Sequence, residues 1–417
     1  MMSLDCSPRS ARDHVRRPET DAPGQDAGVA CVNGEGTTVP TGHEPSRIDR
    51  RTALVGALAA AVGVAGRAGA VSGQTATAEA DPAADPEADP EAGSSPAADE
   101  VIDGTPVGSA GTLTVYSGRS EGLIGPLVPR LEAATGVDLE VRYGNTAELA
   151  VQILDEGDNS PAGLYIAQDA GALGQLGNEG RLAPLPEDVL ALVDPRFRSP
   201  DGLWVGVSGR ARVAAYNTDQ VAEADLPASV LDLTGDRWRG QVGWAPENGS
   251  FQAFVTALRV LRGEDVAREW LEGMLANEAV TFENNGAILR AVASGEVSVG
   301  LVNHYYLYEV EAEEGELPVA NHFFPAGDPG SLVNVAGAGI VVGSDEAEQA
   351  LATIRALLAA PAQRYFSEQT FEYPLSAGVE PVEDLRPLAE IDSPELDLSD
   401  LDDLQGTIDL LIEVGII

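Results

Sequence analysis

Short apolar segments alternate with amphipathic segments from residue 112 onward, and this alternation restricts the fold more than any other feature of the chain. The apolar segments have the length and composition of strands, and the amphipathic segments have the periodicity of helices. The predicted order is strand 113–116, helix 122–134, strand 139–143, helix 146–157, strand 164–167 and a helix ending at Gly180. Thr146 is expected to cap the second helix. This order predicts an α/β domain with a mostly parallel sheet covered by helices on both faces.

A second α/β region follows a long strand-rich segment at residues 205–216. Its predicted elements are helices near 250–262, 264–276 and 286–294, a strand at 297–302, a later strand at 338–342 and helices at 345–359 and 361–369. We expect two lobes joined by long strands, with a ligand cleft between them. The predicted boundaries are 111–210 plus 335–380 for lobe 1, 211–334 for lobe 2, and 381–417 for an acidic helix pair packing on a lobe.

The first 110 residues have the pattern of an exported protein. Residues 1–45 are polar, rich in Pro and Gly, and predict a disordered leader. Arg50 and Arg51 precede a mild apolar stretch, so residues 46–75 predict a twin-arginine export signal, cleaved near Ala70 or kept as an anchor. A buried core helix is the alternative. Residues 76–110 repeat Ala-Asp-Pro and predict an extended acidic tether. An extracellular or cell-surface location follows.

The charge of the chain excludes several classes of partner. The net charge is −42, and every basic residue is Arg. Such a surface argues against nucleic acid and anionic lipid, which are polyanions themselves. Adaptation to high salt explains the charge better than a functional acidic surface, because salt screens the self-repulsion. Cys6 and Cys31 are the only cysteines, and both lie in the leader, so the body of the protein offers no thiolate metal site.

Three tyrosines cluster where the strand at 297–302 ends. Tyr305 and Tyr306 are adjacent, at a strand-to-helix turn that can aim both hydroxyls in one direction. A phenol is deprotonated at neutral pH only by a strong Lewis acid. Fe(III) meets that requirement and prefers hard oxygen donors, whereas Zn or Cu would prefer the imidazole and thiolate that are scarce here. Aromatic packing at a lobe interface is an equal alternative from the residues alone.

Six segments together resemble the ferric-iron-binding extracellular proteins of ABC importers. These are LTVYSGRSE (113–121), EGDNSPAGLYIAQDAGAL (156–173), VSGRARVAAYN (207–217), GQVGWAPENGSF (240–251), SGEVSVGLVNHYYLY (294–308) and FEYPL (371–375). The resemblance implies a two-lobed periplasmic-binding-protein fold of type II, with mixed sheets flanked by helices and joined by hinge strands. It also implies a monomer that binds Fe(III) with phosphate or carbonate as synergistic anion, delivers it to an ABC permease and catalyses nothing.

The resemblance also assigns site residues. The iron-binding tyrosine pair of the family falls on Tyr305 and Tyr306, at the end of the strand discussed above. The groups that hold the synergistic anion fall on Asn248, Gly249, Ser250, Asn285 and Asn303, and the arginine of the carbonate-binding members falls on Arg210. A helix start near residue 249 would suit an anion, because its backbone N–H groups point outward. For Arg210, an ordinary surface position on a strand is an equal alternative.

Two positions depart from the family pattern. Some members have a His where this chain has Ser120, and some have a Glu where it has Gln168, with Asp169 next to it. Three explanations are open. The anion and water complete the iron shell, or another oxygen donor enters it, or the ligand is not iron. The candidate donors are Asp169, Tyr116 and Tyr143, although Asp169 is also a natural helix N-cap. His304 is expected to pack rather than to bind.

Two further functions remain open from the sequence. The same fold could carry a polyamine, thiamine or a phosphonate, of which the cationic ligands call for aromatic walls and carboxylates. A secreted enzyme on the same scaffold could use Asp169 or Glu247 as acid or base. The chain has no Walker-type loop, HExxH or G-x-S-x-G motif, and after residue 70 its only imidazoles are His304 and His322.

Overall fold

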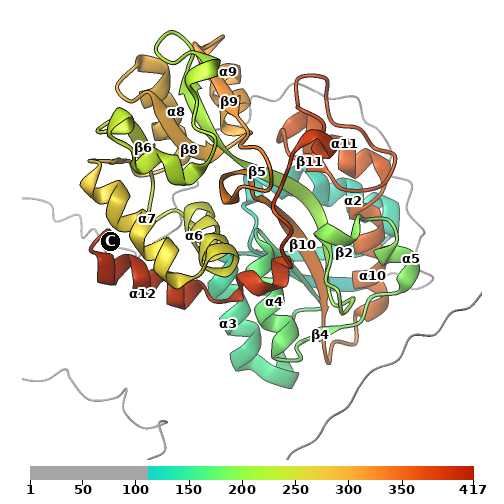
Figure 1. The fold of residues 1–417 in the computed structure, drawn as a ribbon. Coiled ribbons are helices and arrows are strands. Elements are labelled where there is room, and N and C mark those ends of the chain that lie inside the picture. The colour runs from blue at the N-terminus through green and yellow to red at the C-terminus, as the bar shows by residue number, and fades with distance from the viewer. Residues whose placement is uncertain (1–110) are drawn as a thin grey trace, which may run out of the picture. The chain divides into compact units, whose positions relative to one another are not determined.

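The computed structural model describes residues 111–417, which form an α/β structure in which one strand runs through two lobes (Figure 1). The predicted leader at 1–45, the predicted export signal at 46–75 and the predicted tether at 76–110 lie outside the described residues. Within the described part, no helix has both the length and the apolar character needed to cross a bilayer.

Strand β5 (Val205–Asn217) is shared by the sheets of both lobes. The strand order is β2-β1-β3-β10-β5-β8-β6-β7, with β4 beside β10 and with β9 and β11 beside β5. Strand β1 pairs in parallel with β2 and β3, whereas β10 is antiparallel to β3 and β5, so the sheet is mixed. The other strands are β1 (Thr112–Ser117), β2 (Asp138–Tyr143), β3 (Leu164–Ala167), β4 (Leu182–Ala183), β6 (Val242–Trp244), β7 (Val280–Thr281), β8 (Val299–Asn303), β9 (Val319–His322), β10 (Val333–Val341) and β11 (Tyr373–Pro374).

Helices cover both parts of this sheet. Those of lobe 1 are α1 (Glu121–Ile124), α2 (Val128–Thr135), α3 (Thr146–Glu156), α4 (Ala170–Asn178), α5 (Glu187–Leu190), α10 (Ala347–Leu357) and α11 (Ala360–Gln369). Those of lobe 2 are α6 (Gly249–Arg262), α7 (Glu264–Ala276), α8 (Asn285–Ser294) and α9 (Tyr306–Glu314), and α12 (Leu404–Val414) ends the chain.

Two local predictions need correction. The single helix predicted at 122–134 is divided into α1, a 3-10 turn and α2, because Gly125-Pro126 interrupts it. The cap of α3 is Asn145 and not Thr146, since the Asn145 side chain accepts hydrogen bonds from the N–H groups of Ala147 and Glu148. The Thr146 hydroxyl instead accepts from the backbone N–H of Gln168 and donates to the Gly118 carbonyl, so it ties α3 to the loops after β1 and β3.

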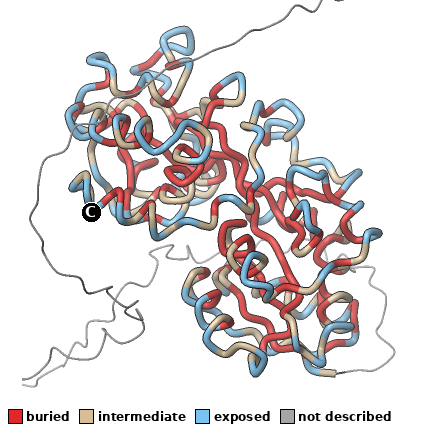
Figure 2. The backbone as a smooth tube through the Cα atoms, turned by 60° about the horizontal axis from the view of Figure 1, so that its bottom comes forward, coloured by how far each residue is buried: buried red, intermediate tan, exposed pale blue. Residues whose placement is uncertain are grey.

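The two lobes have separate hydrophobic cores. The core of lobe 1 extends along β5 as far as Ala211, includes Ala257 from α6, and continues from Leu332 onward. Val213 and Ala214 already belong to the two clusters of lobe 2. Figure 2 shows the buried strands running without a break from one half to the other. Residues 208–213 of β5 are buried, so this strand is both a core strand and the connection between the lobes.

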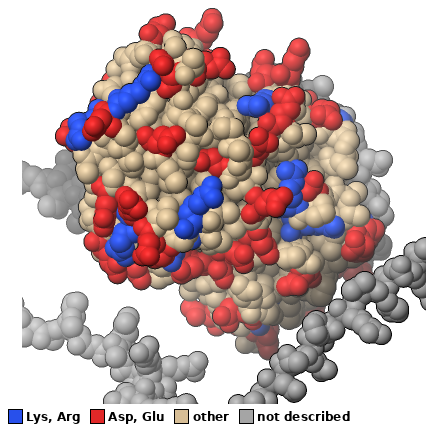
Figure 3. All heavy atoms as spheres, viewed as in Figure 1, with Lys and Arg blue, Asp and Glu red and all other residues tan. Residues whose placement is uncertain are grey.

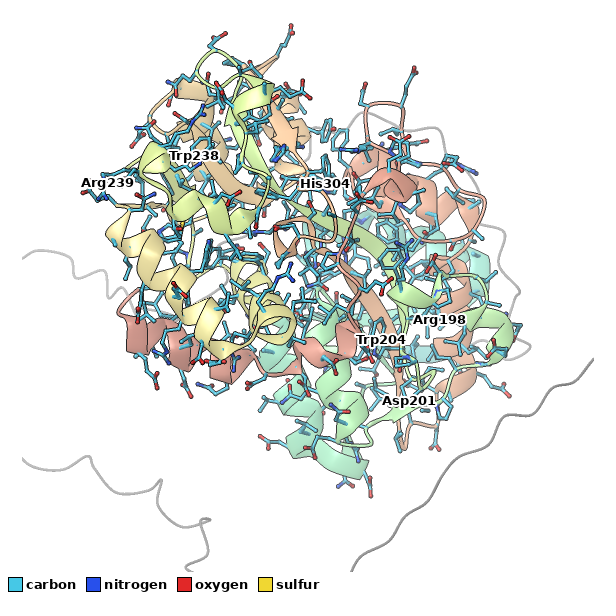
Figure 4. All side chains as sticks on the ribbon, viewed as in Figure 1. Arg198, Asp201, Trp204, Trp238, Arg239 and His304 are labelled. Carbon is cyan, nitrogen blue, oxygen red and sulfur yellow. The ribbon has the colours of Figure 1, made fainter. Side chains whose placement is uncertain are left out.

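The C-terminal strap, which we define as residues 398–414, contacts both lobes. Leu398 and Leu401 are part of the core of lobe 1, whereas Leu410 and Leu411 are part of the core of lobe 2. The indole N–H of Trp204 donates to the hydroxyl of Ser399 at 3.3 Å (Figure 4). The sequence predicts a helix pair on one lobe, and the structure has a 3-10 turn on lobe 1 followed by the single helix α12 on lobe 2.

Acidic side chains outnumber basic ones on the visible surface. Figure 3 shows many Asp and Glu side chains among other residues, with few arginines between them. Several exposed arginines are paired; Arg290, for example, contacts both Glu313 and Glu314 at 2.5 Å. Exposed pairs contribute little to stability, about 0–1 kcal/mol each, so the cores and the strap hold the fold together.

Candidate functional site

Two arginines on β5 lie on the same face of the strand where the lobes meet. Arg210 is opposite Asn334 on β10, and Arg212 is opposite Asn303 at the end of β8. Side chains two residues apart in a strand point to the same side. Both arginines are at least 96% buried. Together with Ser250 and Leu332, these four side chains enclose a narrow space of about 10 Å³.

The start of helix α6 contributes the polar groups of lobe 2. Asn248 caps the helix, and its Oδ1 accepts from the backbone N–H of Ser250 at 3.0 Å and from the Ser250 hydroxyl at 2.5 Å. Asn285, the first residue of α8, is buried and donates from Nδ2 to Asn248 at 3.2 Å. The backbone at Gly249 leads into α6, whose N–H groups carry partial positive charge. Two neighbouring side chains, Asn248 and Ser250, and the distant Asn285 therefore form one polar cluster.

Arg212 brings a positive charge to this cluster. Its Nη1 donates to the Ser250 hydroxyl at 3.2 Å and its Nη2 to the Leu301 carbonyl at 2.9 Å, while the guanidinium lies over the rings of Phe251 and Phe254. Burial lowers the pKa of Arg212 to about 9, against the attraction of the nearby phenols, so the side chain is still a cation at neutral pH. Arg212 forms no ion pair within residues 111–417. A buried cation without a carboxylate partner favours binding of an anion.

The tyrosine pair lies close to Arg212. Tyr306 begins helix α9 and Tyr305 occupies its N-cap position, so both lie in the turn after β8, separated from that strand by His304. Their rings stack with centroids 4.4 Å apart and planes inclined by 29°. Tyr305 is 4% exposed and Tyr306 is half-buried. Both phenols interact electrostatically with Arg212. The rings therefore lie side by side next to the polar cluster, and do not diverge.

A larger pocket of about 480 Å³ opens between the lobes beside Arg210. It takes residues from both lobes and from the strap, and its polar lining includes Asn145, Gln168, Asp169, Arg210, Glu247, Ser250, Gln252, Thr256, Asn334 and Asp402. Because Arg210, Ser250 and Asn334 also line the narrow space, the two spaces adjoin each other. The tyrosine pair is not part of the lining of either one.

The additional ligand candidates fall in different places. Gln168 and Asp169 line the larger pocket, and both polar side-chain atoms of Gln168 are buried without a hydrogen-bond partner in the described part of the chain. Asp169 caps α4 through the N–H of Ala172, and burial raises its pKa although Arg210 opposes the shift. Ser120 lies at the start of α1 and lines neither of the two spaces.

The two other tyrosines suggested as donors are placed differently. The hydroxyl of Tyr116 donates to Glu156 at 3.0 Å and accepts from Arg142 and Gln152, so it is occupied within lobe 1. Tyr143 is 37% exposed on β2. Within residues 111–417, no three His, Cys, Asp or Glu side chains come together in a way that could hold a metal ion. A metal here would therefore need donors beyond a cluster of these four residue types.

Comparison with known proteins decides the family. The bacterial extracellular solute-binding protein family matches residues 159–392. The Fe(3+)-binding periplasmic protein of Serratia marcescens is 31% identical over 308 residues, which cover 73% of this chain and 90% of that protein. The chain belongs to the bacterial extracellular solute-binding proteins. As a solute-binding protein it is a component of transport and not an enzyme, which excludes the alternative based on Asp169 or Glu247.

Two solved structures match the solute-binding protein over the described residues. Iron-bound HitA from Pseudomonas aeruginosa is 35% identical with a TM-score of 0.68, and the match covers 73% of this chain and 99% of HitA. The Trichodesmium protein IdiA (FutA), in complex with iron and citrate ligands, is 29% identical with a TM-score of 0.66, covering 73% and 100%. These likenesses confirm the predicted α/β periplasmic-binding-protein fold.

His304 of the solute-binding protein is a packing residue, as the sequence predicts. Its ring is fully buried at the junction of the lobes (Figure 4), stacked on Tyr373 with centroids 4.5 Å apart. Its Nδ1 accepts from the backbone N–H of Ala211, so Nε2 carries the proton and donates to the Phe371 carbonyl at 2.8 Å. Burial lowers the pKa of His304 to about 4, which keeps the ring neutral at physiological pH.

The buried His304 should make the protein less stable in acid. Its pKa is about 6.5 in the unfolded chain and about 4 in the fold, so its contribution is complete above pH 6.5 and is lost as the pH falls toward 4. The loss should be about 3 kcal/mol. We expect His304→Gln, which keeps a donor for Phe371, to be less stable than wild type at pH 7 and to differ less at pH 4.5. Urea unfolding measures this, and an equal gap at both pH values would contradict it.

Sequence reasoning missed Arg212 and Asn334. Arg212 lies two residues after Arg210 on a predicted strand, so the period of two could have placed both on one face. No local pattern marks Asn334, because its position depends on the antiparallel pairing of β10 with β5.

Proposed function

We propose that the protein captures Fe(III) together with a small anion, phosphate or carbonate, between its lobes and delivers the iron to an ABC permease. The relatives named above support this, because one is described as Fe(3+)-binding and two were solved with iron. In the proposed site Tyr305 and Tyr306 bind the metal. The anion is held by Asn248, Gly249, Ser250, Asn285, Asn303 and Arg210, to which we add Arg212.

The observation that carries the proposal is the stacked tyrosine pair next to Arg212, a buried arginine that has no carboxylate partner in the described part of the chain. Two phenolates and a doubly or triply charged anion would neutralise a trivalent cation and leave negative charge over. Arg210 and Arg212, both on strand β5, supply positive charge that offsets this negative charge. Hydrogen bonds to a charged oxyanion are about twice as strong as neutral ones. The metal and the anion therefore stabilise one another in this arrangement.

The remaining coordination positions of the iron are available to the anion, to water and to groups from lobe 1. Gln168 and Asp169 are the candidates, because they line the pocket that faces α6 across the cleft. Ser120 lines neither of the two spaces, so we do not propose it as a ligand. Closure about β5 would bring lobe 1 groups toward the tyrosines, and a ligand that contacts both lobes favours the closed state.

The site does not suit the cationic alternatives. A polyamine or thiamine would meet two buried guanidinium groups at Arg210 and Arg212. A phosphonate would fit the arginines but would leave the tyrosine pair without a role. Fe(III) with an anion would use both the tyrosine pair and the two arginines.

We also propose where the protein is located and that it acts as a monomer. The family consists of extracellular solute-binding proteins. We propose export by the twin-arginine route through Arg50 and Arg51, with the tether holding the binding domain away from the cell surface. The acidic surface suits high salt and a monomer that meets its permease transiently.

Titration of the metal-free protein with ferric salt tests the function. A phenolate-to-iron charge-transfer band should appear in the visible range and saturate at one iron per protein when phosphate or carbonate is present. Protein purified without chelator should contain iron by metal analysis. A colourless protein whose melting temperature does not respond to Fe(III) would contradict the proposal.

A further inference from the structure

Three buried charged side chains contact one another in a row next to the proposed anion site: Arg119, Glu372 and Arg210. The carboxylate of Glu372 binds Arg119 through both oxygens, at 2.7 Å to Nη2 and 3.2 Å to Nη1. The same carboxylate lies 3.9 Å from Nε of Arg210. Arg119, Glu372 and Arg210 are 0%, 2% and 4% exposed. Charges this deeply buried are costly unless they are paired, so the arrangement calls for a functional or structural reason.

Further hydrogen bonds fix Glu372 in place. The hydroxyl of Thr370 donates to its Oε2 at 3.1 Å, and Nη1 of Arg119 also donates to the Ser208 hydroxyl at 3.2 Å. Burial alone would raise the pKa of Glu372, but Arg119 and its hydrogen bond outweigh burial and hold that pKa below its usual value. The carboxylate is therefore an anion that cannot turn away from the arginines.

Arg210 is held on two sides. Its Nη2 donates to the backbone carbonyl of Gln168, and Glu372 lies near its Nε. Arg119 makes both short contacts with the carboxylate, and Arg210 contacts the same carboxylate at a longer distance. Arg210 also lines both spaces of the candidate site.

The segment around Glu372 also contacts the turn that carries the tyrosines. Phe371 has a left-handed backbone with φ of 50°, an uncommon conformation for a residue with a side chain. Its carbonyl accepts the hydrogen bond from His304, which directly precedes Tyr305. One short segment therefore touches both the arginine of the anion site and the turn of the metal site.

We infer that Glu372 is a positioning residue, which holds Arg210 through a carboxylate shared with Arg119 and so sets the affinity for the synergistic oxyanion. This inference rests on the proposed function. Glu372 does not contact the anion itself. Its effect must pass through Arg210, and that requirement makes the inference testable.

Phosphate titration of the iron-free protein by calorimetry gives the direct test. Loss of a residue that orients a metal ligand typically costs about 10–100-fold in metal affinity, and by analogy we expect Glu372→Gln to weaken phosphate binding about tenfold. Arg210→Gln should weaken it at least as much, and the double variant should bind no more weakly than Arg210→Gln alone. Coupled residues give such non-additive effects, whereas independent residues give additive ones. Additive losses, or phosphate affinity unchanged in Glu372→Gln, would overturn the inference.

Two further variants separate positioning from folding. The double variant Arg119→Gln/Glu372→Gln removes one positive and one negative charge together, so the net charge does not change. We expect this variant to fold and still to bind phosphate weakly. Glu346→Gln is the matched control, because this carboxylate accepts from the backbone N–H of Thr114 in the same lobe. It should leave phosphate affinity unchanged. A loss in Glu346→Gln as large as in Glu372→Gln would show a general structural effect and overturn the inference.

The iron measurements distinguish this inference from the proposed function. With Fe(III) and saturating phosphate, Glu372→Gln should still form the charge-transfer band, but at higher phosphate concentration than wild type. A wild type without any band would contradict the iron function and leave the phosphate result to stand by itself. A wild type that binds no phosphate would overturn the inference, since Arg210 would then have no anion to hold.

Discussion

Replacing either member of the tyrosine pair with Phe is expected to abolish the visible charge-transfer band or to shift and weaken it strongly. Tyr305→Phe and Tyr306→Phe each remove one proposed iron-binding oxygen and keep the ring. The stacking at 4.4 Å is thereby preserved. Losing an outer-shell partner costs about 10–100-fold in metal affinity, so losing a ligand oxygen should cost more than 100-fold. Competitive titration against a chelator of known affinity measures the loss.

Tyr308→Phe is the matched control on the same helix. The Tyr308 hydroxyl donates to the backbone carbonyl of Asp384 at 2.9 Å, and its ring stacks on Phe371. Its removal should leave the ferric affinity and the band unchanged. If Tyr308→Phe lost as much affinity as the other two variants, the assignment of the metal to Tyr305 and Tyr306 would fail. An unchanged band in the double Phe variant would have the same consequence.

Substitutions of three glycines on helix α4 should have opposite effects on stability. A Cβ at Gly171 would lie 2.3 Å from the carbonyl oxygen of Leu401, and one at Gly174 would lie 2.3 Å from that of Ser399. Both obstacles are backbone of the C-terminal strap, so no side chain can rotate away. Gly171→Ala and Gly174→Ala should each destabilise the protein by about 1–3 kcal/mol, as overpacking does. The strap should separate from lobe 1 first.

Gly177→Ala provides the comparison. A Cβ there would meet only a side-chain methyl of Leu203, at 3.3 Å. Alanine in a helix is favoured over glycine by about 0.5–1 kcal/mol, so this variant should be as stable as wild type or more stable. Chemical unfolding of the three variants, with limited proteolysis after residue 397, measures both effects. Equal stability of all three would contradict the close packing of the strap.

The fold was predictable from the sequence where the pattern is local. The alternation of strands and helices after residue 112 predicts the elements of lobe 1, and the tyrosine turn follows from the buried strand at 297–302. The break at Gly125-Pro126 was readable too, but the helical periodicity on both sides concealed it. Asn145 and Thr146 are both good capping residues, and only the contact of Thr146 with the loops after β1 and β3 decides between them.

The site was harder to predict, because it depends on the pairing of strands that lie far apart in the sequence. The resemblance to known proteins indicated Asn248, Ser250 and Asn285, and the structure brings these three together. It did not indicate that Glu372 lies behind Arg210, because the two are joined by the pairing of β11 with β5. The strap also escaped prediction, since an amphipathic pattern does not say which lobe a helix will cover.

The shared strand has a consequence for the order of events during uptake. Atoms near a rotation axis move least when two bodies turn about it, and Arg210 and Arg212 lie in the middle of the strand that both bodies share. If the lobes turn about β5, the proposed oxyanion should meet nearly the same charges in the open and in the closed molecule. We therefore expect the anion to bind before the metal arrives and to remain bound after the metal leaves.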